Sequence, residues 1–309
     1  KGGANRTFMD FAVIADHVQT YHGDAVRVSV VEGKGRVLLA EADFEPGERI
    51  LLEYPLIEVI EASCPAYDVL KKLKQENILE FAPIFYWAAL SSLTSTQVAT
   101  ALVSPWRAVP KETQVQALQL HMEELSTPSA SILRVLESLW DEDPPEALLL
   151  ERLLQAWIYN SFDLSEGDQE AGVIFFASAM MSHSCSPNAA WHLDESNSFI
   201  LHARRFIEEG EEVTISYLSP TELRMPTSHR RELLQSTKGF HCTCSRCMEP
   251  LDASRAFRCS CGAEVWAVNM TQVEGVPQED KVTCHCGCHV KNEVFELEKR
   301  LEQWARSRP

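Results

Sequence analysis

The sequence lacks several features that would assign the chain to other classes of protein. No apolar run among its 309 residues has the length of a membrane-spanning helix, and residues 81–90 suffice only for a buried helix. Positive charge is scarce, with 28 Lys and Arg against 45 Asp and Glu, so the formal net charge is −17. A charge of this sign disfavours nucleic-acid binding. It fits equally well a role in solubility and a preference for basic partners.

Internal repeats, low-complexity segments and a recognisable secretory signal are also missing from the sequence. The apolar content of 45% is enough for one large core or two modest ones. We therefore expect a globular, intracellular protein in the cytoplasm, the nucleus or both.

The hydrophobic pattern changes twice along the chain. Residues 26–61 alternate β-branched and polar residues, with Gly33, Gly35 and Pro46-Gly47 as turns, which predicts strands. From about 66 to 162 apolar residues recur at helical spacing, which predicts a helical block. Beyond it the pattern is mixed. It predicts a short helix over 172–181, a hairpin turning at Asp194–Ser198, a strand ending at Tyr217, a helix over 228–236 and an amphipathic helix over 294–307.

The ten cysteines are unevenly placed, with Cys64 and Cys185 standing apart from the rest. The other eight fall in the last quarter of the chain, and several are two residues apart: Cys242, Cys244, Cys247, Cys259, Cys261, Cys284, Cys286 and Cys288. A C-x-C pair closes a disulfide only with strain, whereas it readily presents two thiolates to one tetrahedral metal ion. The spacing favours zinc over a disulfide framework.

Four motifs occur in a fixed order before these cysteines. They are Gly33-Lys34-Gly35-Arg36 in a turn, Asn160-Ser161-Phe162, the segment 182–188 with the sequence SHSCSPN, and the segment 210–217 that ends at Tyr217. Phe240 then precedes the first C-x-C pair. Each motif alone is weak, since a lone G-x-G is most often a tight turn. Their order and spacing together carry the weight.

Together these motifs resemble the SET-domain lysine methyltransferases, and most closely the SMYD-like subgroup, over residues 26–61 and 155–250. The resemblance implies an α+β SET fold of small curved sheets with a pseudoknot. It divides the chain into an N-terminal segment and first SET half (1–61), a helical insertion (62–165), a second SET half (166–238), and a zinc-binding post-SET region with a C-terminal helix (239–309). A Rossmann-type methyltransferase is disfavoured, because no G-x-G-x-x-G follows a strand and opens a helix.

The resemblance also implies a function, the transfer of a methyl group from S-adenosylmethionine to a lysine amine of a protein substrate. Tyr217 is the expected active-site tyrosine, which orients the methyl through weak C–H···O contacts. The expected cofactor-binding residues are Gly33, Lys34, Gly35, Asn160, Ser182, His183 and Phe240, with Phe240 stacking on the adenine. The Phe175-Phe176 pair is expected in the core, with one of the two as a candidate wall of the lysine channel.

Two zinc ions are expected. By the family pattern, Cys185 joins Cys242, Cys244 and Cys247 in an all-thiolate structural site. Beyond the family core, the twin C-x-C-G pattern favours a zinc ribbon held by Cys259, Cys261, Cys284 and Cys286. Cys288, His285 or His289 remains an alternative ligand of this second ion. The other histidines, His17, His22, His121, His192 and His202, are expected to be surface or packing residues.

Three departures from the family pattern bear on function. Ser182 stands where the family usually has Asn, and Lys238 stands where SMYD-like proteins often carry a second channel tyrosine. The segment 62–165 holds one cysteine, Cys64, so no MYND finger fits there. MYND-less relatives include the apical-complex lysine methyltransferases of parasites.

The first two departures, at Ser182 and Lys238, support an alternative function, a catalytically inactive scaffold on the SET fold. A zinc-ribbon nucleic-acid binder is disfavoured by the charge. The substrate, histone or non-histone, and the degree of methylation stay open.

Overall fold

The computed structural model describes residues 8–103, 106–123, 125–165, 167–259, 261–268, 286–287 and 300. The chain forms two compact units. Unit 1 comprises residues 1–181 and 189–213, and unit 2 comprises residues 182–188 and 214–309. No helix within the described ranges is long and apolar enough to cross a membrane.

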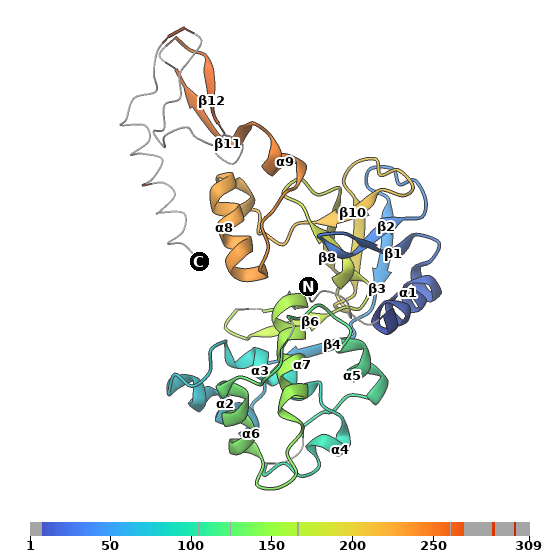
Figure 1. Cartoon of the computed structure of the whole chain (residues 1–309), viewed down its shortest axis with the longest axis vertical. Helices are drawn as coiled ribbons and strands as arrows, with labels where there is room; N and C mark the ends of the chain where they lie inside the picture. Colours follow the sequence, from blue (N-terminus) through green and yellow to red (C-terminus); the bar gives the residue numbers. More distant parts are fainter. Residues whose placement is uncertain are drawn as a thin grey trace. The chain divides into compact units, whose positions relative to one another are not determined.

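Unit 1 begins with a helix packed on a hairpin. Helix α1 (Phe8–His22) contacts strand β1 (Val26–Val31) and buries Ile14 and Val18 (Figure 1). Strand β1 pairs antiparallel with β2 (Gly35–Ala40), and β2 pairs with the first half of β10 (Glu212–Ile215). The predicted strands are confirmed here, whereas the sequence analysis identified no helix before residue 26.

Two small three-stranded sheets complete the strands of unit 1. In one, β9 (Phe199–Ala203) lies between β3 (Arg49–Glu53) and β8 (Ala189–Leu193). In the other, β6 (Ala171–Ile174) lies between β4 (Ile57–Ile60) and β5 (Phe162–Asp163). The predicted hairpin turn is confirmed: the Asp194 N–H donates to the Ser198 carbonyl at 3.1 Å. Asn197 provides the left-handed residue of this turn, with a φ of 59°.

The helical block of unit 1 is built around α3 and α7. Its helices are α2 (Pro65–Gln75), α3 (Pro83–Ser91), α4 (Ser95–Val98), α5 (Lys111–Ala117), α6 (Ala130–Leu139) and α7 (Ala147–Asn160). Helices α3 and α7 pack side by side (Figure 1). The buried Trp157 of α7 donates its indole N–H to the Ser92 hydroxyl at 2.8 Å, so its one polar atom is satisfied in the core.

Two sequence predictions about local structure are wrong. The segment 172–181 is largely not helical: it continues β6 to Ile174 and then forms a single 3-10 turn at Ser178–Met180. Periodicity alone does not separate a short apolar run in a strand from one in a helix. Within the predicted helical block, apolar residues keep helical spacing over 112–125, but helix α5 ends at Ala117.

The buried carboxylate of Glu53 explains the shape of the segment after β6. One oxygen accepts the N–H groups of Phe176 and Ala177 at 2.8 and 2.7 Å. The other accepts the N–H and hydroxyl of Ser178 at 2.7 and 2.6 Å. Backbone N–H groups that have no helical or strand partner are therefore satisfied by one side chain from β3. This carboxylate fixes the chain just before the SHSCSPN motif.

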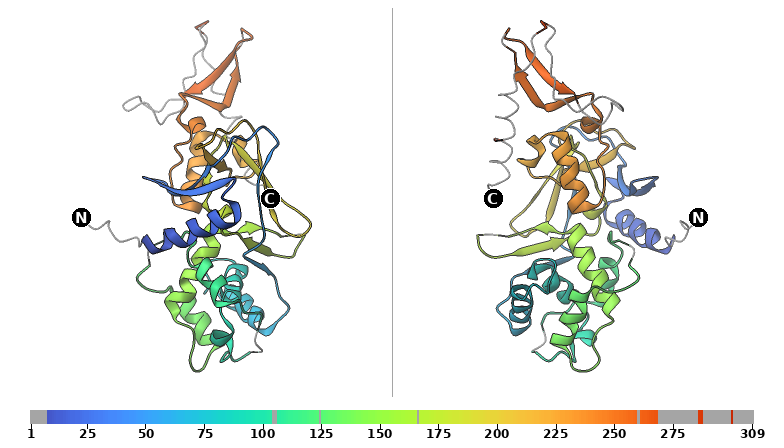
Figure 2. Two further views of the ribbon diagram at one scale, coloured as in Figure 1. Left: turned by 90° about the vertical axis from the view of Figure 1, so that its right-hand side faces the viewer. Right: turned by 60° about the vertical axis from the view of Figure 1, so that its left-hand side comes forward.

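Unit 2 contains the rest of that motif and the cysteine-rich region. Strand β7 (Ser182–His183) runs parallel to the second half of β10, and α8 (Thr227–Lys238) follows after a 3-10 turn, η2 (Glu222–Arg224). Helix α9 (Ser245–Met248) leads into a hairpin of β11 (Leu251–Arg258) and β12 (Glu264–Val268), seen from two further sides in Figure 2. The predicted helix over 294–307 lies outside the described residues, except for position 300.

Replacing Glu53 with Ala is expected to lower the free energy of unfolding by about 3 kcal/mol or more, because three buried N–H groups lose their acceptor at about 1–3 kcal/mol each. Urea denaturation followed by circular dichroism measures this. Glu32→Ala, at an exposed position after β1, is the control and should change stability by less than about 0.5 kcal/mol. Equal stability of the two variants would contradict the role given to Glu53.

Candidate functional site

Four cysteine sulfurs converge in unit 2. The Sγ atoms of Cys185, Cys242, Cys244 and Cys247 all lie within 4.8 Å of one another, and those of Cys185 and Cys247 are 3.6 Å apart. A zinc tetrahedron with Zn–S bonds of ~2.3 Å has S···S edges of about 3.8 Å, so the arrangement fits a site with four thiolate ligands. No disulfide forms among the described cysteines. The quartet is the one that the family pattern implies, and its residues fit zinc.

Three arginines surround the four sulfurs. The fully buried Arg230 of α8 donates to Cys185 Sγ at 3.3 Å and to Cys247 Sγ at 3.6 Å. Arg231 donates to the carbonyls of Cys242 and Cys247, and Arg246 donates to the Cys185 carbonyl. Four thiolates on one divalent ion leave excess negative charge, which the buried guanidinium of Arg230 compensates. The sequence analysis did not identify these arginines.

The protonation of the thiols is strongly coupled. Hydrogen bonds from the thiols of Cys185, Cys242 and Cys247 hold the pKa of Cys244 far below its usual range. Hydrogen bonds to Cys185, Cys244 and Cys247 raise the pKa of Cys242 in turn. Without a metal ion, some of the four thiols therefore keep their protons and donate them to a neighbouring thiolate. Binding of a metal ion would displace these protons, because the thiolate is the ligand.

His183 connects the sulfur cluster to the predicted catalytic tyrosine. Its Nδ1 accepts the backbone N–H of Tyr217 at 3.0 Å, and its Nε2 lies 3.3 Å from Cys185 Sγ. Because Nδ1 is an acceptor, the proton is assigned to Nε2, which faces the sulfur. Burial lowers the pKa of His183 to about 4, which is consistent with a neutral ring. The His183 side chain thus fixes the position of Tyr217. This role is additional to the expected one, in which His183 binds the cofactor.

Tyr217 lies among the side chains of unit 2 with 39% of its surface exposed. Its ring centroid is 5.4 Å from that of His183 and 6.4 Å from that of Phe240. Helix α8 ends at Lys238, and Gly239 turns the chain with a φ of 73°, a left-handed cap that favours glycine. This turn places Phe240 against Tyr217 and His183. The structure therefore brings together three of the predicted site residues.

The end of the SHSCSPN motif is tied to β10, which ends at Ile215, two residues earlier than the predicted strand end at Tyr217. Asn188, which is 1% exposed, accepts the backbone N–H and the hydroxyl of Thr214 at 2.8 and 3.0 Å. Ser182 pairs with Thr214 from the other side of the loop, through the parallel bridge of β7 and β10. The motif is thus fixed to β10 at both ends.

Other predicted site residues belong to unit 1. Gly33 and Gly35 have φ values of 79° and 85°, so the turn between β1 and β2 requires glycine at both positions. Lys34 between them forms an ion pair with Glu212 at 2.5 Å. Asn160, at the end of α7, donates its side-chain amide to the carbonyls of Ala156 and His121 at 2.7 and 2.8 Å. Here its amide therefore fixes the segment around residue 121.

The Phe175-Phe176 pair lies fully in the core of unit 1. Phe175 packs edge-to-face on Phe162 at 5.5 Å, and Phe176 packs in the same way on the ring of His17 at 4.8 Å. These contacts favour the expected core role over a position in the channel wall.

The second cysteine group is described in part. The Sγ atoms of Cys259, Cys261 and Cys286 lie within 4.8 Å of one another, with Cys259 and Cys286 3.6 Å apart. Gly262 and Gly287 follow the C-x-C pairs with φ values of 87° and 81°. The three sulfurs are close enough to share one metal ion. The remaining expected or alternative ligands, Cys284, His285, Cys288 and His289, lie outside the described residues.

His17, His22 and Glu53 form a third group with ligand atoms within 4.8 Å of one another. Burial lowers the pKa of both histidines, which favours their neutral forms. The Glu53 oxygens, however, already accept four hydrogen bonds from residues 176–178, which accounts for their lone pairs. The residues therefore fit a structural carboxylate rather than a metal site.

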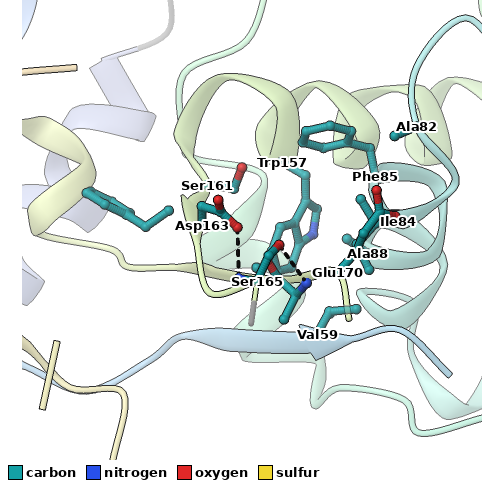
Figure 3. A pocket seen from close by; sticks show the side chains of 13 residues that line it. Val59, Ala82, Ile84, Phe85, Ala88, Trp157, Ser161, Asp163, Ser165 and Glu170 are labelled. Atoms are coloured by element: carbon teal, nitrogen blue, oxygen red, sulfur yellow. Dashed lines mark hydrogen bonds between the residues drawn. The ribbon is translucent and has the colours of Figure 1, made fainter. Parts of the chain in front are cut away.

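A pocket of about 340 Å³ opens in unit 1 beside β5 and β6 (Figure 3). Its apolar side is formed by Trp157, Phe85 and Ile84, and Asp163 and Glu170 provide its acidic groups. None of the predicted cofactor or catalytic residues is among the residues that line it. The pocket therefore does not by itself locate the cofactor site.

Comparison with known protein families matches residues 35–218 to the SET domain, which is more than half of the chain. The chain belongs to the SET-domain family. The match ends one residue beyond Tyr217, so Phe240 and the cysteine-rich region lie outside it. The α+β SET fold with small sheets and a helical insertion is confirmed.

The similarity to SMYD proteins is also confirmed. Mouse histone-lysine N-methyltransferase SMYD3 is 37% identical over 106 residues, which cover 34% of this chain and 24% of that protein. Histone-lysine N-methyltransferase SET5 of Candida glabrata is 29% identical over 85 residues, covering 28% and 16%. The chain thus spans less than a quarter of these relatives. Among solved structures, the SET domain of LSMT bound to lysine and AdoHcy matches 82% of this chain and 60% of that chain, with 15% identity and a TM-score of 0.40.

Replacing Arg230 with Met is expected to weaken zinc binding by about 10- to 100-fold, the usual effect of losing a partner of the metal ligands. Competition with a chromophoric chelator measures the affinity. Arg134→Met removes an exposed arginine paired with Glu137 and serves as the control. Unchanged zinc affinity in the Arg230 variant would show that the guanidinium does not compensate the cluster.

Proposed function

We propose that the chain is an S-adenosylmethionine-dependent protein-lysine N-methyltransferase. The observation that carries this proposal is the arrangement in unit 2, where His183 joins the Tyr217 backbone to the four-cysteine cluster and Phe240 faces both rings. Tyr217 is 39% exposed, so a substrate can reach it. The names of the relatives, histone-lysine N-methyltransferases, support the same activity.

Tyr217 is the proposed catalytic residue. When bound, S-adenosylmethionine supplies an electrophilic methyl group. The Tyr217 hydroxyl would orient that methyl through C–H···O contacts, and apolar surroundings would favour the neutral, nucleophilic form of the acceptor lysine. Fixing the reactants in line provides much of the rate. The His183–Tyr217 hydrogen bond serves this purpose, because it holds the tyrosine backbone in place.

We propose residues in each of the two units as contacts of the cofactor. In unit 2, Phe240 offers an aromatic face for the adenine, and the strand Ser182–His183 offers backbone groups. In unit 1, the turn Gly33–Gly35 exposes backbone without Cβ atoms. Asn160 would contact the cofactor by exchanging its hydrogen bonds to Ala156 and His121. We propose zinc at both cysteine groups, with a structural role, because four cysteine ligands leave no open position for chemistry.

The proposed substrate is a protein with an accessible lysine, histone or non-histone. The net charge of −17 favours a basic segment around that lysine. The second candidate function is an inactive scaffold. Ser182 and Lys238 favour it, because both depart from the family pattern at the proposed site.

Tyr217→Phe is expected to reduce methyl transfer about tenfold, since losing one or two weak C–H···O contacts costs about 1–2 kcal/mol in the transition state. The assay is transfer of labelled methyl from S-adenosylmethionine to histones and to lysate proteins. Tyr54→Phe, at an exposed tyrosine of unit 1, is the matched control. If the native chain binds the cofactor and zinc but labels no protein in either sample, the scaffold function is favoured.

Removing zinc with a chelator is expected to abolish methyl transfer and to lower the melting temperature, because the four-cysteine cluster holds the residues on either side of Tyr217 and Phe240. Adding zinc back should restore both quantities. Full activity in a preparation shown by elemental analysis to be free of zinc would overturn the proposed role of the cluster.

A further inference from the structure

Lys238 has an unusual position at the end of α8. Its Nζ lies over the Tyr217 ring, 5.9 Å from the ring centroid. The side chain is half-buried, and burial lowers the pKa of its amine. Gly239 then turns the chain so that Phe240 also faces Tyr217. A lysine amine and the proposed catalytic tyrosine are therefore held together within one unit, by a rigid helix end.

The pKa of another lysine, Lys71, shifts in the opposite direction. Lys71 forms an ion pair with Glu61 at 2.5 Å, and hydrogen bonding to that carboxylate raises the pKa of its amine. An ion-paired ammonium has no free electron pair and cannot act as a nucleophile. Desolvation at Lys238 instead favours the neutral amine, which is the reactive form in methyl transfer.

We propose that Lys238 is itself a methyl acceptor, modified in cis at the active site beside Tyr217. The inference rests on the proposed methyltransferase activity and adds a modification site to it. Its geometric basis is the short path from the end of α8 to the Tyr217 ring. A group fixed beside the reaction centre behaves as if present at high effective concentration, so it is modified even where no protein substrate is bound.

The chemical step is balanced with a sulfonium methyl donor. The neutral Nζ of Lys238 attacks the methyl carbon, the N–C bond forms, and the C–S bond breaks with its electron pair left on sulfur. S-adenosylhomocysteine leaves, and the new methylammonium carries the positive charge that the sulfonium carried before. The proton that Lys238 gives up beforehand goes to solvent.

Mass spectrometry of the full chain tests this proposal. The zinc-loaded protein is incubated with deuterated-methyl S-adenosylmethionine and cleaved after glutamate, which releases the peptide 233–249. This peptide contains Lys238 as its one lysine, so a labelled methyl in it locates the modification. The expected result is labelled Lys238 at a fractional rate that does not change when the protein is diluted tenfold, as a reaction in cis requires.

Lys72→Arg, at an exposed lysine of α2, is the matched control and should leave labelling of the peptide unchanged. Lys238→Arg should remove the label from the peptide, and Tyr217→Phe should slow it about tenfold; zinc content and melting temperature show that each variant is folded. Labelled lysate proteins with an unlabelled Lys238 would overturn this inference and leave the proposed function intact. A labelling rate that falls with dilution would overturn the reaction in cis. No label on any protein, with the cofactor bound, would overturn both proposals.

Discussion

The structure of unit 2 depends on four cysteine sulfurs that are held together in a buried position. The Sγ atoms of Cys185 and Cys247 are 3.6 Å apart, and thiolates at that distance require positive charge between or around them. The guanidinium of Arg230 provides part of it, and the proposed zinc ion would provide the rest. Because the four cysteines come from two separate segments, their cluster closes a loop of more than fifty residues and fixes both ends of it. His183 is oriented by the same sulfur that the metal would bind.

Unit 1 has an organising interaction of the same kind, in which a buried anionic group is again matched by hydrogen-bond donors. The Glu53 carboxylate collects three backbone N–H groups and one hydroxyl from a segment that lies more than 120 residues away. In both units a buried charge is matched by several donors, which is the condition under which a buried charge is tolerated. In unit 1 the fixed segment precedes the SHSCSPN motif, and in unit 2 the cluster includes Cys185 of the motif itself.

Much of this structure follows from local sequence patterns. The strands over 26–61 and the turn at Asp194–Ser198 depend on alternation and turn residues, which are visible within a few residues. The cysteine quartet is implied by the resemblance to the family, since Cys185 lies more than fifty residues before its partners. The strand at Ala171–Ile174 is predicted as helix because a short apolar run has no distinctive period, and one of its two partners, β4, is far away in the sequence. Arg230 was missed for a related reason: in the sequence it is one of two adjacent arginines in a polar helix, and nothing local marks it as buried. The hydrogen bonds of Asn160 depend on residue 121, which no spacing rule connects to it.

A single residue, His241, separates Phe240 from Cys242. The Phe240 ring and the Cys242 sulfur are therefore positioned together, because the single residue between them allows little change in their separation. An insertion or deletion at this point would displace both together, whereas after Cys247 the chain is next fixed at Asp252 and Ser254 and can vary beyond them. Related proteins would then be expected to differ in what they attach beyond the last sulfur of the quartet, as this chain does with its β11–β12 hairpin, and to keep the spacing before it.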